Sequence, residues 1–147
     1  MRVCFLLGCA AGFSFALSAC GAFEGHGCDQ TGAPTLFVDF EEFGLVTTAQ
    51  PTKRSGVWIN GTCSFNTLQE PTLSDATNFR IEPIQPAEPT FPMLVDIRGQ
   101  SVFNFDLVFS PLTVGMHETT LTVPFGEGVD ADPSDSLVVT FRGVAEK

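Results

Sequence analysis

Few side chains in this sequence stand at spacings that could support catalysis. His117 and Glu118 open a run that begins like the His-Glu-x-x-His helix of zinc proteases, but Leu121 stands where the second histidine ligand is required. The run also alternates polar and apolar residues as a strand does, so its side chains would point to opposite faces. The adjacent carboxylates Glu41 and Glu42 would diverge for the same reason. The sequence contains neither a nucleophile elbow nor a phosphate-binding glycine loop, so we expect no enzymatic activity.

Three carboxylates lie close together in sequence and could offer hard oxygen ligands to calcium. They are Asp130, Asp132 and Asp135. Their segment lacks the glycine and the terminal glutamate of an EF-hand loop, and its Asp-Pro-Ser run is ordinary turn chemistry. We expect a solvated loop here and no metal or other cofactor, with calcium binding as the alternative.

The N-terminal leader carries the cysteine for which the sequence indicates a covalent modification. Arg2 is the only charged residue before or within the apolar segment Val3–Leu17, which is too short for a comfortable membrane span. The closing residues Leu17-Ser18-Ala19-Cys20 resemble the lipobox of bacterial lipoproteins. That resemblance implies cleavage after residue 19, a diacylglyceryl group on the Cys20 thiol and usually a further acyl chain. Several acyl chains anchor a protein firmly, whereas one binds marginally.

Residues 1–19 have two other interpretations, an ordinary cleaved signal peptide and an uncleaved N-terminal helix. Under the lipoprotein interpretation, Gly21 follows the modified cysteine, where aspartate would indicate retention in the inner membrane. By that analogy we expect a lipid-anchored protein of the cell envelope, with the outer membrane favoured where the cell has two membranes.

The remaining cysteines predict one disulfide. Cys4 and Cys9 leave with the leader and Cys20 takes lipid, so Cys28 and Cys63 are left. An even number of cysteines in an exported protein favours a disulfide, and closing a loop of roughly 36 residues would add about 3–4 kcal/mol of stability in the chain-entropy model. The alternative is two free thiols. A zinc site is not expected, because no histidine stands nearby at ligand spacing.

Charge argues against one class of partner. The chain has 17 acidic and 7 basic residues, a formal net charge of −10. Such a surface repels phosphate backbones, so we expect no nucleic-acid binding. It also repels anionic lipid head groups, which leaves the acyl chains on Cys20 as the predicted membrane attachment.

Composition divides the chain into a signal peptide (1–19), a flexible tether (20–34) and one domain (35–147). The tether is rich in glycine. In the domain, short alternating runs are separated by turn residues at roughly ten-residue spacing, which predicts an all-β sandwich. The candidate strands are Leu36–Phe40, Ser55–Asn60, Cys63–Leu68, Phe79–Glu82, Met93–Ile97, Val102–Phe109, Glu118–Val123 and Leu137–Arg142.

Period-two alternation predicts which side chains fill the core. The polar residues Asn104 and Asp106 are expected in water. We expect the proline-rich segment Pro83–Pro92 to cross the surface without forming a strand, and Phe125–Ser136 to be a loop. The side chains expected to point inward are Phe103, Phe105, Leu107, Phe109, Thr119, Leu121, Val123, Leu137, Val139 and Phe141.

The order of residues in the second half of the domain resembles the ASH family, whose bacterial members are often labelled choice-of-anchor D. This part of the resemblance is carried by Phe109-Ser110-Pro111, Gly115, Leu121, Asp132-Pro133 and Leu137-Val138-Val139-Thr140-Phe141-Arg142-Gly143. The first half fits more loosely, through Phe43-Gly44, Asn60-Gly61-Thr62 and Asn78-Phe79-Arg80-Ile81. The resemblance covers residues 36–145. It implies an immunoglobulin-like antiparallel β-sandwich of about seven strands, related to the major sperm protein domain, that binds partners or acts as a spacer.

These observations predict a non-enzymatic, lipid-anchored envelope protein. Its sandwich would serve a structural purpose or contact an envelope protein or polysaccharide. The alternative is a carbohydrate- or calcium-binding accessory module. A sugar platform usually needs an exposed Trp or Tyr, and Trp58 is the only such residue in the chain, with its orientation left open by the sequence.

Overall fold

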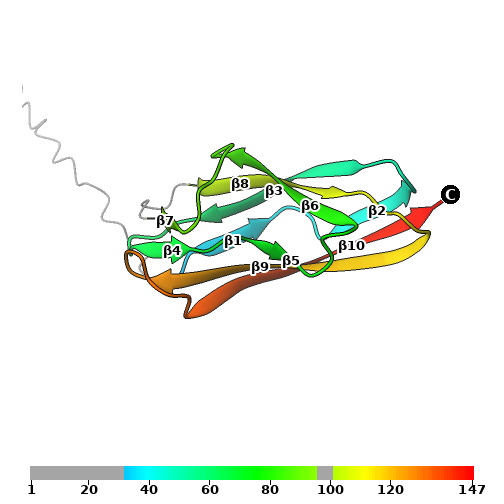
Figure 1. Ribbon diagram of the computed structural model, residues 1–147. Helices are drawn as coiled ribbons and strands as arrows, with labels where there is room; N and C mark the ends of the chain where they lie inside the picture. The colour runs from blue at the N-terminus through cyan, green and yellow to red at the C-terminus, as the bar shows by residue number, and fades with distance from the viewer. Residues whose placement is uncertain (1–31, 96–100) are drawn as a thin grey trace, which may run out of the picture.

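The computed structural model describes residues 32–95 and 101–147, which form two β-sheets packed face to face (Figure 1). The predicted all-β sandwich is therefore confirmed. These residues contain no helix that is long and apolar enough to cross a membrane. The predicted lipobox Leu17-Ser18-Ala19-Cys20 and the predicted disulfide partner Cys28 lie outside the described residues.

The first sheet contains four strands in the order β1-β3-β8-β6, and all its pairings are antiparallel. The strands are β1 (Thr35–Val38), β3 (Thr52–Asn60), β6 (Phe79–Gln85) and β8 (Ser101–Phe109). In chain order this arrangement corresponds to the ABED sheet of the immunoglobulin fold.

The second sheet has six strands. Five follow the order β2-β10-β9-β4-β7, and β5 pairs with β9 beside them. The strands are β2 (Glu42–Thr47), β4 (Asn66–Leu68), β5 (Thr72–Leu73), β7 (Met93–Val95), β9 (Gly115–Glu127) and β10 (Asp135–Glu146).

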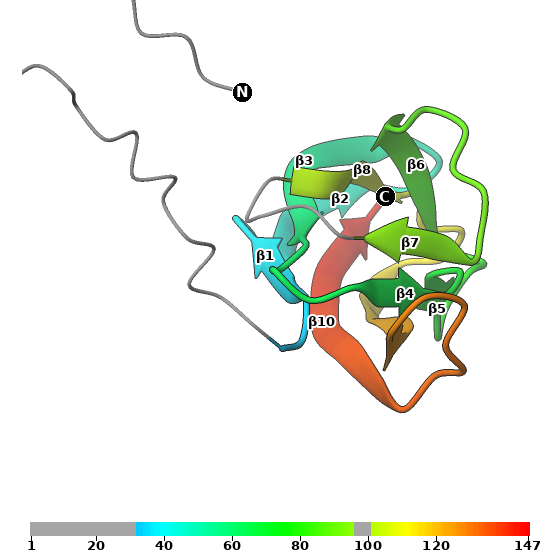
Figure 2. The same ribbon diagram turned by 90° about the vertical axis from the view of Figure 1, so that its left-hand side faces the viewer.

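One pairing departs from the predicted antiparallel arrangement, because β2 lies parallel to β10. The chain passes from β1 in the first sheet to β2 in the second through Asp39–Glu41 without a hairpin. β2 thus meets the last strand of the domain side by side and in the same direction. Figure 2 shows β1 and β10 along one side of the sandwich, with β2 behind them.

All eight candidate strands overlap an observed strand, but the expected number of about seven is too low. The described residues form ten strands, which are the eight candidates together with β2 and β5, two strands that were not predicted. In β2 the inward residues Phe43 and Val46 are separated by two exposed residues, next to a register shift, so the strand lacks the alternation that identifies strands.

Two segments expected to lack strands are partly in strands. β9 continues to Glu127 and β10 begins at Asp135, so the loop predicted for Phe125–Ser136 is shorter than expected. β6 continues to Gln85 and includes Pro83, which is tolerated because β6 is an edge strand.

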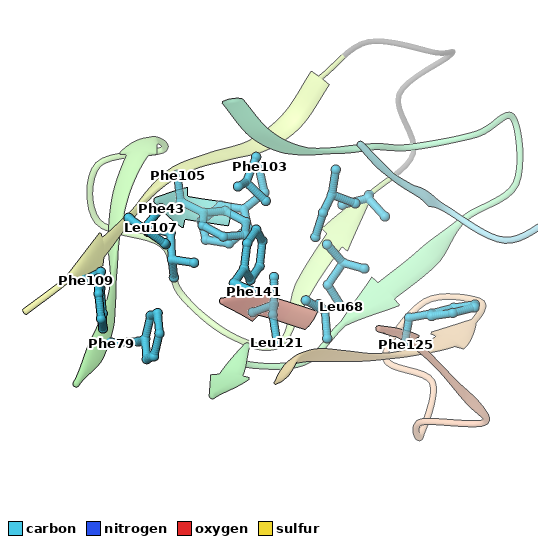
Figure 3. Close-up of a cluster of buried hydrophobic side chains, with 14 of the residues drawn as sticks. Phe43, Leu68, Phe79, Phe103, Phe105, Leu107, Phe109, Leu121, Phe125 and Phe141 are labelled. Atoms are coloured by element: carbon cyan, nitrogen blue, oxygen red, sulfur yellow. The ribbon is translucent and has the colours of Figure 1, made fainter. Parts of the chain in front are cut away.

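The core lies between the sheets and is dominated by phenylalanine (Figure 3). The rings of Phe79 and Phe109 stack with their centroids 4.7 Å apart, and the Phe43 ring lies 5.4 Å from that of Phe109. All ten side chains predicted to point inward lie in or against the core; Leu137 and Val139 are partly buried, and the others are buried. Burial of each large apolar side chain stabilises the fold by roughly 1.5–3 kcal/mol.

Asp106 was expected in water, and that prediction is wrong. The residue is buried on the outer face of the first sheet, where its Oδ2 lies 3.3 Å from Lys53 Nζ. The neighbouring Val108 is also buried on this outer face, beside its register partners Lys53 and Arg80. Long basic side chains on the flanking strands can cover such positions with their apolar stems.

A glycine in the last strand is required by the core. Gly143 lies in β10 facing the first sheet, and a Cβ atom at this position would overlap the ring of Phe109. The two residues are linked by packing, which gives a physical reason for two of the positions that carry the ASH resemblance.

Candidate functional site

The described chain begins at a corner held by side-chain hydrogen bonds, here called the N-terminal corner (Gly32, Thr62, Ser64 and Asn66). Thr62 Oγ1 donates to Gly32 O at 2.8 Å and Asn66 Nδ2 donates to the same oxygen at 3.1 Å. Gly32 N–H donates to Ser64 Oγ at 3.1 Å. Thr62 and Asn66 are buried, so these bonds fix the start of the domain against the turn between β3 and β4.

Cys63 lies in the N-terminal corner and is disulfide-bonded. Every other cysteine lies outside the described residues, so the pairing Cys28–Cys63 stays a prediction. The hydrogen bond from Gly32 to Ser64 places the chain just downstream of Cys28 beside Cys63, an arrangement compatible with that pairing.

The zinc-like run folds as a strand, as its alternation predicts. His117 Nε2 lies 2.8 Å from Thr113 O, and the imidazole ring lies 5.7 Å from that of Phe109. Glu118 points to the opposite face, where one of its carboxylate oxygens, Oε2, pairs with Arg142 Nε at 2.6 Å. His117 and Glu118 therefore diverge and cannot act on one substrate atom.

The three aspartates considered as an alternative calcium site are not brought together. Within residues 32–95 and 101–147, no group of three or more His, Cys, Asp or Glu side chains is placed to hold a metal ion. Asp135 Oδ1 accepts from Ser136 N–H at 2.7 Å, whereas the backbone of Asp132 lies against Gly126. Asp132 and Asp135 thus make separate local contacts rather than sharing one site.

A carboxylate that the sequence did not single out is enclosed by donors. Asp75 Oδ1 accepts from the N–H groups of Thr77 and Asn78 at 3.1 Å each, and Asp75 Oδ2 accepts from Asn78 Nδ2 at 2.8 Å. Burial works to raise the pKa of Asp75, but these hydrogen bonds outweigh it and hold the pKa below the usual value of 3.8. The Asp-x-Thr-Asn spacing of an Asx turn could have identified this residue.

The same turn, which precedes β6, is bound to the segment that follows β8. Asn78 O accepts from Ser110 N–H at 2.7 Å and Asn78 Oδ1 accepts from Leu112 N–H at 3.0 Å. Asp75 N–H also donates to Thr119 Oγ1 of β9 at 3.0 Å. Asp75 and Asn78 thus fix this turn against the segment after β8 and against β9, which is a structural role.

An ionic network covers the middle of the first sheet's outer face. Lys53 Nζ lies 3.1 Å from Glu82 Oε2 and 3.3 Å from Asp106 Oδ2, and Arg80 also pairs with Glu82 at 2.9 Å. Hydrogen bonds that Lys53 donates to Glu82 and Asp106 raise the pKa of Lys53, and those that Lys53 and Arg80 donate to Glu82 lower the pKa of Glu82. The acidic groups here are engaged with bases, so they are poor candidates for proton transfer.

Trp58 points outward from the first sheet, which settles its orientation. Its neighbours Val57 and Ile59 are buried in the core, whereas Trp58 is half-buried and stacks on Phe37 of β1, with ring centroids 5.5 Å apart and planes 10° apart. Beside Trp58 lies an open, mainly apolar hollow of about 390 Å³, also lined by Ile84 and Asn104. An aromatic ring next to an amide is a common arrangement for binding the apolar face of a ligand.

A second hollow lies between the two sheets, along β1 and the first half of β10. It has a volume of about 510 Å³ and includes Leu36, Val38, Leu137 and Val139 in its lining. Glu41 is its only charged lining residue among those described. This feature is called the β1–β10 groove below.

The outer face of the second sheet carries a row of exposed apolar side chains. Val144 of β10 lies between its register partners Leu45 of β2 and Met116 of β9. Their exposed fractions are 42%, 64% and 76% in that order. The row lies near the C-terminal end of the sandwich, opposite the end that carries β4 (Figure 1).

Comparison with known proteins shows similarity at the level of the fold. No family model matches the chain, and no curated protein matches it. Among solved structures, WR4, an MSP family member of C. elegans, is 13% identical, with a TM-score of 0.46 over 76% of this chain and 97% of that chain. SSP-19, an MSP-domain-like protein of Caenorhabditis elegans, is 17% identical, with a TM-score of 0.40 over 69% of this chain and 92% of that chain.

Proposed function

We propose that this chain is a non-enzymatic, lipid-anchored protein of the cell envelope whose β-sandwich serves a structural purpose or binds an envelope protein or polysaccharide. The observation that carries the proposal is the sequence Leu17-Ser18-Ala19-Cys20, which precedes a single sandwich. Acyl chains on Cys20 would hold the domain at a membrane surface, with the outer membrane favoured where two membranes are present.

The arrangement of polar side chains supports binding or display over catalysis. The histidine and carboxylates described above make ion pairs and turn contacts on separate parts of the domain. General acid–base or nucleophilic catalysis requires such groups to converge on one substrate position, and His117 and Glu118 lie on opposite faces of β9.

We also propose that the sandwich is of the ASH, or choice-of-anchor D, type. The residues behind that resemblance occupy positions with definite packing roles. Phe109 packs where Gly143 has no side chain, Leu121 is fully buried, and Gly115 has a φ of 132°, a conformation that L side chains rarely adopt. Members of that family act as binding or spacer modules, which agrees with the proposed role.

The test of the anchor is the mass of the N-terminal peptide in protein purified from a bacterial envelope, with radiolabelled palmitate as a second readout. We expect a lipidated N-terminal Cys20 in the parent chain and no lipid in Cys20→Ser. The matched control is Cys9→Ser, which changes a cysteine of the predicted leader and should leave lipidation intact. An unmodified N-terminus at another position in the parent chain would refute the anchor.

A carbohydrate-binding role is the second candidate, and the outward orientation of Trp58 favours it. The hollow between Trp58 and Ile84 offers an aromatic surface beside the amide of Asn104, the combination that contacts the apolar face and hydroxyls of a sugar ring. Glycan-array binding that is lost in Trp58→Ala and retained in Leu45→Ala, which alters an exposed apolar residue elsewhere, would establish this role. Equal binding by both variants would exclude it for this surface.

A further inference from the structure

One strand edge of the domain lacks a partner strand over half its length. β9 pairs with β10 from Asp135 to Ala145. On the opposite edge, β2 pairs with β10 only at Arg142 and from Val144 to Glu146. Within the part of the chain that the structure describes, residues 135–141 of β10 are therefore paired on one side only.

The hydrogen-bonding direction of β10 identifies the groups on this open edge. Arg142 N–H donates to Glu41 O at 2.9 Å, on the β2 side of the strand. The N–H and C=O groups of alternate residues point to the same edge of a strand, so those of Val138 and Thr140 face the open edge too. None of the described residues hydrogen-bonds to these four backbone groups.

Among the described strands, β1, which lies across the groove, also has one edge without a partner strand. Asp39 N–H donates to Gly56 O at 2.9 Å, on the β3 side of β1. By the same alternation, Leu36 and Val38 direct their backbone N–H and C=O groups toward the β1–β10 groove. Free edges of two different sheets thus border one hollow of about 510 Å³.

The side chains between these edges are apolar and only partly covered. Leu36, Val38, Leu137 and Val139 pack against the core but remain partly exposed along the groove. A segment entering here would bury them and hydrogen-bond to β10 at the same time. Both kinds of contact favour an extended backbone, because only an extended chain matches the repeat of a strand edge.

We propose that the β1–β10 groove binds an extended segment of a partner polypeptide, which adds as a strand to the free edge of β10 at Val138 and Thr140. This inference rests on the proposed role of the domain as an interaction module and names the chemistry of its partner. It is independent of the lipid anchor, because all the groups involved belong to the described domain.

Charge indicates which partner fits. Glu41 lines the groove, and the exposed residue Asp135 begins β10 directly before the lining residues of that strand. A second copy of this chain would bring another net charge of −10 to the same place and would be repelled. The occupant is therefore a foreign segment with apolar residues at alternate positions and a lysine or arginine placed opposite Glu41.

The test begins with a phage-displayed library of random dodecapeptides, selected on the full chain in mild detergent. We expect enriched peptides to alternate apolar residues and to carry basic ones, and their affinities are then measured by fluorescence anisotropy. Val138→Pro removes a backbone N–H that faces the groove and leaves the hydrogen bonds between β10 and β9 in place. It should weaken peptide binding about tenfold, because one hydrogen bond is lost and the proline ring would clash with the added strand. The matched control Val138→Thr keeps the amide and should bind within about twofold.

Two further measurements make the result decisive even if Val138→Pro fails to fold. Hydrogen exchange of the parent chain should show the amides of Val138 and Thr140 exchanging fast when free and slowly with peptide bound, whereas Val139 and Phe141 stay protected throughout. Glu41→Gln should weaken binding of a basic peptide by about threefold, and the distant Glu88→Gln should not. Absence of enriched peptides, equal binding by both Val138 variants, or protection of Val138 before peptide is added would overturn the proposal. None of these outcomes depends on lipidation, so failure here is distinguishable from failure of the anchor.

Discussion

The packing of Gly143 against Phe109 gives a quantitative prediction for Gly143→Ala. The added methyl group would overlap the phenyl ring, which is fully buried and also stacks on Phe79. Because the ring cannot move without disturbing that stack, we expect the substitution to destabilise the domain by about 2 kcal/mol. Such a change lowers the Tm by about 10 °C in a domain of this size, as measured by circular dichroism.

The physical cause can be separated from a general intolerance of glycine replacement. Phe109→Leu shortens the ring that would clash, so the double variant Gly143→Ala/Phe109→Leu should be less destabilised than the two single changes combined, by at least about 1 kcal/mol. Gly44→Ala is the control. Gly44 has a φ of 73°, and no atom lies within 4 Å of the position of a Cβ. The substitution should therefore destabilise the domain by about 1 kcal/mol through backbone strain alone. Additive effects of Gly143→Ala and Phe109→Leu would refute the overlap as the cause.

Three other predictions concern the turns and the N-terminal corner. The pKa of Asp75 is lower in the folded state than its ordinary value of 3.8, so the ionised carboxylate stabilises the fold above pH 3.8, and this stabilisation is lost as the pH falls through the folded pKa. Asp75→Asn should therefore lower the Tm at neutral pH. The Tm of this variant should also decline less steeply than that of the parent chain below about pH 4. Thr62→Val removes the hydroxyl that donates to Gly32 O and accepts from Asn66, and urea unfolding should show a loss of about 1–3 kcal/mol, whereas an unchanged midpoint would contradict the described bonds. Cys63→Ser removes the disulfide and should lower the free energy of unfolding by about 3 kcal/mol. Mass spectrometry of a tryptic digest of the parent chain should show a peptide that joins Cys63 to Cys28.

Strict alternation accounts for the parts of the fold that the sequence predicted well. In β8 every second residue from Phe103 to Phe109 is a large apolar side chain, and all of them are buried. β9 shows the same pattern at Thr119, Leu121 and Val123. Where the local repeat matches the pleat of a strand, the pattern alone fixes which face is buried.

One wrong prediction, for Asp106, and one orientation that the sequence left open, for Trp58, both depend on contacts between distant residues. Asp106 is buried because Lys53, on another strand, reaches it across the sheet. The orientation of Trp58 depends on the phase of β3, which is shifted by an irregularity between Arg54 and Val57. Neither the register of β3 against β8 nor a long-range ion pair is encoded in a local repeat.

The candidate interaction surfaces were beyond sequence analysis for a related reason. The open edge of β10 exists because β2 begins pairing only at Arg142, a register between opposite ends of the chain. The sequence did identify the aspartates near residue 130 and the histidine at 117, because their residue types are conspicuous. Their distances from one another, which decide whether they can act together, follow only from the fold.

The N-terminal corner has a mechanical consequence for a domain tethered through its N-terminus. Among the described residues, Gly32 would be the first to receive a pulling force from the N-terminal side, and its hydrogen bonds to Thr62, Ser64 and Asn66 would share that load with a second segment of the chain. The load would thereby pass into the turn after β3 before it could separate β1 from β3. If the predicted tether anchors the domain, the corner would spread a stretching force over two segments, so that the sandwich would keep its shape under load.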